Sequence, residues 1–75
     1  MAHQGGHGIS NLEYDIVTTL SNLMQGREAL DKYANDAQQA GDRETAEIFR
    51  TIQTNNDDAA QRLRNALSRV IQQAD

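Results

Sequence analysis

The stretch DAQQAGDRETAE, residues 36–47, decides the fold because a stop signal for one helix is followed directly by a start signal for another. Gly41 is the residue type best suited to the left-handed backbone conformation that ends many helices. Asp42 can cap a new helix at once, and Glu44 is well placed for the positive N-terminal end of its dipole. The stretch therefore predicts two helices joined by a tight turn.

On the N-terminal side of this turn, apolar residues recur at the spacing of three and four that is typical of an amphipathic helix. Ser10 and Glu13 form a capping-box pattern, and Ile9 and Tyr14 have the spacing of a hydrophobic staple, so this helix is expected to begin at about Asn11. Its main stripe consists of Leu12, Ile16, Leu20, Leu23, Leu30, Ala34 and Ala37.

The C-terminal side shows the same period and contains no proline that would interrupt a helix. Its stripe consists of Phe49, Ile52, Ala59, Leu63, Ala66 and Val70. We expect helices over about residues 11–40 and 43–72, with the turn at 41–42, so that residues 10–75 form one helical hairpin. Residues 1–9 are rich in Gly and His without periodicity and are expected to be a disordered polar tail.

A chain of 75 residues forms a single domain with a small core, which usually needs a disulfide, a metal or a partner to be stable. The chain has no cysteine, which leaves a metal held by nitrogen or oxygen ligands, or oligomerisation. Two helices side by side would leave half of each stripe in water, and a second hairpin would cover it. We therefore expect an all-α homodimer, a four-helix bundle with the core Ile16, Leu20, Leu23, Leu30, Phe49, Ile52, Leu63 and Val70.

Composition argues against two large classes of partner. A net charge of -4 and only three aromatic residues do not suit a nucleic-acid binder, which uses clustered cations and stacking rings. No apolar run approaches the roughly 20 residues of a membrane span, and the N-terminal stretch does not read as a signal peptide. We expect a cytoplasmic protein with no nucleic-acid or membrane partner, although an unidentified protein partner fits the helical surface.

Both stripes are interrupted near their middles, by Gly26 and Arg27 in the first helix and by Asn56 in the second. Because these positions lie at similar distances from the turn, we expect them to face one another and to form a polar layer. Three interpretations are open: a device that sets the register between hairpins, a metal or small-ligand site that uses nearby carboxylates, or a partly exposed layer without a particular role. A glycine in mid-helix costs about 1 kcal/mol relative to alanine, so Gly26 asks for a cause such as close helix approach.

Three segments, GREALDKY at residues 26–33, AEIFR at 46–50 and AAQRL at 59–63, resemble the first helical hairpin of the rubrerythrin and ferritin-like superfamily. The resemblance implies a ferritin-like bundle. It also places the family's two metal-binding glutamates on Gly26 and Asn56, and its histidine on Ala59. None of these can hold iron as the family's ligands do, so the resemblance argues against di-iron chemistry.

These observations favour a non-enzymatic structural or interaction protein with no cofactor. The alternative is a metal-binding or redox protein of the ferritin-like class whose carboxylate site has moved to Glu28, Asp57 and Asp58. No catalytic residue is predicted, because the only imidazoles, His3 and His7, lie in the tail and no serine has a histidine on an ordered element as its base.

Overall fold

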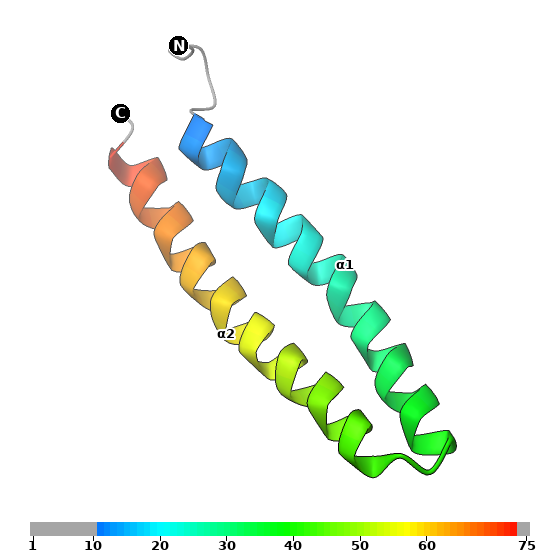
Figure 1. Cartoon of the computed structure of the whole chain (residues 1–75). Coiled ribbons are helices and arrows are strands. Elements are labelled where there is room, and N and C mark those ends of the chain that lie inside the picture. Colours follow the sequence, from blue (N-terminus) through cyan, green and yellow to red (C-terminus); the bar gives the residue numbers. More distant parts are fainter. Residues whose placement is uncertain (1–10, 74–75) are drawn as a thin grey trace.

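The computed structural model describes residues 11–73, which form two antiparallel α-helices joined by a short turn (Figure 1). Helix α1 spans Asn11–Gln39 and helix α2 spans Arg43–Gln73, so that the start of α1 and the end of α2 lie at the same end of the hairpin. The prediction of an all-α helical hairpin is confirmed, and the helix ends lie within one residue of those expected. The expected tail at residues 1–9 and the capping role of Ser10 and Ile9 lie outside the described residues.

The turn closes α1 with the hydrogen-bond pattern of a Schellman motif. Gly41 adopts a positive φ of 83°, as its position after the helix predicted. Its amide donates to the Gln38 carbonyl at 3.0 Å, and the Asp42 amide donates to the Ala37 carbonyl at 2.9 Å. These two bonds satisfy carbonyl groups that the end of a helix would otherwise leave without partners.

The same turn starts α2 through the side chain of Asp42, which confirms the predicted cap. The backbone amide of Thr45 donates to Oδ1 of Asp42 at 3.0 Å, and the Thr45 hydroxyl donates to Oδ2 at 2.6 Å. The hydroxyl and then the amide bond hold the pKa of Asp42 below its ordinary value of 3.8. Stop and start signals are therefore both local, and they reverse the chain within three residues.

The two helices contact each other along rows of residues spaced by seven, which is the pattern of a coiled coil. We call these rows the seam. On α1 they are Ile16, Leu23, Leu30 and Ala37 with Leu20, Arg27 and Ala34, and on α2 they are Ala46, Gln53, Ala60 and Leu67 with Phe49, Asn56, Leu63 and Val70. All of these residues except Arg27 are buried or half-buried.

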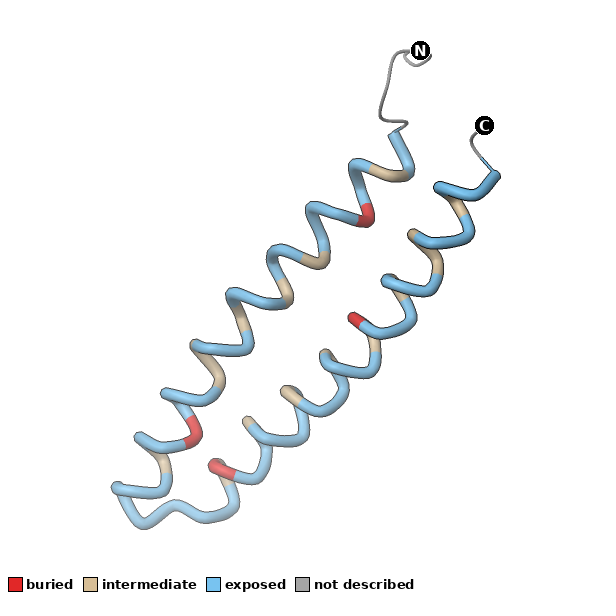
Figure 2. The backbone as a smooth tube through the Cα atoms, turned by 180° about the vertical axis from the view of Figure 1, so that it is seen from behind, coloured by how far each residue is buried: buried red, intermediate tan, exposed pale blue. Residues whose placement is uncertain are grey.

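The seam gives the hairpin a thin core. Within the described residues only Ile16, Ala34, Ala46 and Ala60 are buried, and they lie on the sides of the helices that face each other (Figure 2). Three of the four are alanines, which bury little apolar area. Of the expected bundle core, Ile16 is buried, Ile52 is exposed, and the other six residues are half-buried. A larger core would therefore need something to cover the hairpin from outside.

The two glycines of the described chain are expected to respond in opposite ways to alanine. Gly41→Ala should lower the free energy of unfolding by about 1 kcal/mol, because a Cβ atom disfavours the left-handed conformation. Gly26→Ala is the control: within one hairpin a Cβ there would meet nothing within 4 Å, so helix propensity should raise the stability of the hairpin by up to about 1 kcal/mol. Urea denaturation followed by circular dichroism measures both, and equal effects of the two substitutions would contradict this account of the turn.

Acid should weaken the cap of α2. Because the pKa of Asp42 is lower in the folded chain, its contribution to stability is complete above about pH 3.8 and is lost as the pH falls through the folded pKa. Asp42→Asn keeps the size of the side chain but removes the titration, so its stability curve should be flatter than that of the wild type in this range. Thermal melts at pH 5, 4, 3 and 2 test this, and parallel curves for the two proteins would refute it.

Candidate functional site

The interruption near the middle of each stripe brings a cation and a carboxylate together across the seam. Arg27 of α1 donates from Nε to Oδ1 of Asp57 at 3.0 Å and from Nη2 to Oδ2 at 3.3 Å. The hydrogen bond and then the charge of Asp57 raise the pKa of Arg27 above its ordinary value. Both side chains are about half exposed, so the pair lies at the edge of the seam and is screened by water.

Gln53 completes this polar layer, and the pattern of apolar residues did not reveal it. Its Nε2 donates to the backbone carbonyl of Arg27 at 3.1 Å and to Oδ1 of Asp31 at 2.9 Å. The signal that could have found it is its spacing of seven from Ala46 and Ala60, which places it on the seam. A half-buried amide that bonds a specific backbone group favours one alignment of the two helices.

Asn56 is half-buried on the seam, as expected for a polar interruption, and it lines a hollow together with Arg27 and Asp57. Gly26 is not explained by packing within the hairpin. Beyond its own helix backbone, no atom of the described chain lies within 4 Å of the position that its Cβ would take, so close approach of α2 does not account for this glycine. In the hairpin, Gly26 faces open space.

The carboxylates of the metal alternative are not brought together in the hairpin. Asp57 is engaged by Arg27, and Oδ2 of Asp58 pairs with Nε of Arg62 at 3.1 Å along its own helix. Across residues 11–73, no three His, Cys, Asp or Glu side chains gather so that they could hold a metal ion. Glu28, Asp57 and Asp58 therefore do not form a site within one chain.

We call one side of the hairpin the charged face. On each helix it carries the residues that come one position after a seam row, the row of Ile16 on α1 and the row of Phe49 on α2. These residues are Val17, Met24, Asp31 and Gln38 on α1 with Arg50, Asp57, Arg64 and Ile71 on α2. Arg50 donates to Oε1 of Gln38 at 3.3 Å across the helices. Polar contacts between the helices thus concentrate on this face.

We call the opposite side the apolar face. On each helix it carries the residues that come one position before a seam row, the row of Leu20 on α1 and the row of Ala46 on α2. These residues are Leu12, Thr19, Gly26 and Tyr33 on α1 with Thr45, Ile52, Ala59 and Ala66 on α2, and none is charged. The rings of Tyr33 and Phe49 meet here with centroids 5.7 Å apart, which shows that both helices contribute to one continuous side. Leu12, Tyr33 and Ile52 remain substantially exposed. This face is the candidate functional site.

Replacing Asn56 by leucine tests whether the polar layer sets alignment. The apolar side chain should raise the free energy of unfolding by about 1 kcal/mol, roughly half the value of a fully buried leucine, because the site is half-buried. It should also broaden the range of oligomers, because a polar group on a seam specifies register at a cost in stability. Urea denaturation and native mass spectrometry report the two effects, and lower stability with an unchanged oligomer would contradict the register interpretation.

Comparisons with protein-family models, with curated proteins and with solved structures found no match. The resemblance to the ferritin-like superfamily therefore rests only on the residues quoted above. Within residues 11–73, neither helix is both long and apolar enough to cross a membrane.

Proposed function

We propose that this chain is a non-enzymatic structural or protein-interaction module, and that two copies associate through their apolar faces to form a four-helix bundle. The observation that carries the proposal is the apolar face itself, a continuous uncharged side that lies beside a seam in which only four of the described residues are buried. We also propose a cytoplasmic location, which the lack of cysteine fits because a reducing compartment does not support disulfides.

The distribution of apolar rows supports a bundle over an isolated hairpin. A two-helix coiled coil needs only the two seam rows on each helix, whereas a helix in a bundle carries a third apolar row beside them. Here α1 and α2 each carry a third row without charges, and both rows lie on the same side of the hairpin. Each copy thus has six such rows, four in the seam and two on the apolar face. A second hairpin stacked on that side would bring all of them into one core.

The energy available from covering the apolar face is large for a chain of this size. Burying an aliphatic or aromatic side chain fully stabilises by roughly 1.5–3 kcal/mol, and Leu12, Tyr33 and Ile52 are each between 40% and 55% exposed. Ile48, which is 52% exposed, lies beside this face near the turn. The hairpin extends over 53 × 19 Å, and a standard interface of about 800 Å² per partner fits within such a surface.

The polar groups of the hairpin support a structural role for the layer at its middle. Arg27, Gln53 and Asp57 are bonded to one another or to the backbone across the two helices. Such bonds hold the helices in register. The ferritin-like scaffold is part of the proposal only as a bundle without its metal site, because Gly26, Asn56 and Ala59 stand where that family has its ligands.

A pair of charge insertions on opposite faces tests the proposal. Ile52→Glu places a carboxylate on the apolar face and should convert the dimer to a monomer, because a buried unpaired charge is costly. Val17→Glu is the matched control: Val17 is 50% exposed on the charged face, Ile52 is 40% exposed, and both are β-branched. The control should stay dimeric.

Sedimentation equilibrium measures the mass of each variant, and circular dichroism verifies that each remains helical. A monomeric wild type, or dimers that survive Ile52→Glu and dissociate with Val17→Glu, would overturn the proposed face.

A further inference from the structure

The apolar face is bordered by two rims whose charged residues have opposite signs. Each rim consists of the residues that come three positions after those of the apolar face in the sequence. On α1 they are Asp15, Asn22, Ala29 and Asp36, and on α2 they are Ile48, Asn55, Arg62 and Arg69. The charged members are carboxylates on α1 and guanidinium groups on α2.

Two of these four charges already have a partner on their own helix. Lys32 donates to Asp36 at 3.1 Å, and Arg62 pairs with Asp58 at 3.1 Å. Across the described chain, 11–73, the side chains of Asp15 and Arg69 form no ion pair. Among the charged residues of the two rims, Asp15 and Arg69 are therefore the acid and the base without an ion-pair partner in the described chain, one on each rim.

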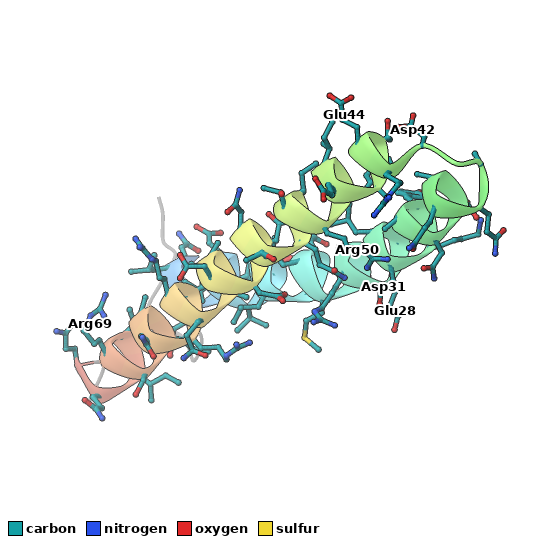
Figure 3. The ribbon with its side chains drawn as sticks, turned by 90° about the horizontal axis from the view of Figure 1, so that it is seen from below. Glu28, Asp31, Asp42, Glu44, Arg50 and Arg69 are labelled. Atoms are coloured by element: carbon teal, nitrogen blue, oxygen red, sulfur yellow. The ribbon has the colours of Figure 1, made fainter. Side chains whose placement is uncertain are left out.

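Asp15 and Arg69 also lie at the same level along the hairpin. The contact between Arg27 and Asp57 shows that these two residues lie at the same level. Asp15 lies twelve residues before Arg27, and Arg69 lies twelve residues after Asp57. Figure 3 shows Arg69 near the open end, far from Asp42 at the turn. The width of the apolar face separates the two charges within one copy.

Two symmetric arrangements can stack one apolar face on another with antiparallel neighbouring helices. With both turns at the same end, α1 of one copy lies against α2 of the other, and Asp15 stands level with Arg69 of the partner subunit. With the turns at opposite ends, α1 lies against α1. Asp15, four residues from the start of α1, then stands level with Asp36 of the partner subunit, three residues from its end.

The apolar rows permit both arrangements, whereas the rim charges favour one. Complementary charges around an interface suppress the wrong alignment because like charges oppose it. We infer that the partner for the apolar face is a second copy held with its turn at the same end, so that each copy's Asp15 faces the other's Arg69. This inference rests on the proposed dimer and adds its orientation.

A spin label at one position near the turn distinguishes the arrangements. The chain has no cysteine, so Gln39→Cys, at the exposed end of α1, gives a single labelling site. With the turns together, the two labels should lie within about 35 Å, since a bundle is about two helix diameters across. With the turns apart, the 29 residues of α1 separate them by about 44 Å or more.

Pulsed electron–electron double resonance measures this distance, and three results are distinguishable. A distance below about 35 Å supports the inference. A distance of about 44 Å or more overturns the orientation but keeps the dimer. If no distance is detected and the sample sediments as a monomer, the dimer is overturned as well.

Charge reversal gives a second readout of the same orientation. Asp15→Arg and Arg69→Asp should each weaken self-association by roughly tenfold, because like charges would then face each other at both rims. Mixing the two variants should give heterodimers, which native mass spectrometry resolves. A tighter homodimer of Asp15→Arg would overturn the inference, because that result requires Asp36 of the partner subunit to lie opposite.

Discussion

Contact between α1 and α2 runs along two rows of side chains on each helix. The narrowness of this contact limits the free energy of unfolding that the hairpin can reach without a partner. Within residues 11–73, alanines occupy three of the four buried positions, so the helices remove little apolar surface from water. Hydrophobic stabilisation scales with buried area, and a chain of this size has little area to spare. The third, uncharged row of each helix matters for this reason: Leu12, Tyr33 and Ile52 add apolar area that the seam does not use.

Polar residues also occupy part of the seam, where they take the place of apolar packing and bond across the helices. Gln53 and Asn56 occupy positions where an aliphatic side chain would pack better, and Arg27 extends to the edge of the seam to reach Asp57. The bonds that Gln53 and Arg27 make to particular partners on the other helix are satisfied at one register only. The arrangement exchanges some stability for specificity, as single polar residues do in coiled coils. It also concentrates polar contacts on one face and leaves the other face uncharged.

Local signals made the fold predictable from the sequence. Gly41 and Asp42 act through bonds within a few residues of themselves, so the turn and both adjoining helix ends could be read without knowledge of packing. The seam was harder to predict. On α2 the apolar stripe is wider than the seam, and periodicity locates the centre of the stripe without saying which edge meets α1. Ala46, Gln53 and Ala60 lie at that edge and were not predicted as core, whereas Ile52, which was, lies outside the seam. The empty space at Gly26 depends on the distance between the helices, which no local pattern reports.

The concentration dependence of thermal unfolding tests most directly whether the hairpin needs a second copy. Association that accompanies folding makes the melting temperature depend on protein concentration through mass action. Circular dichroism melts of the wild-type chain over a hundredfold range of concentration should show a melting temperature that rises steadily with concentration. A melting temperature that stays constant over that range would mean that the thin seam suffices alone, and would contradict the account of the apolar face as half of a larger core.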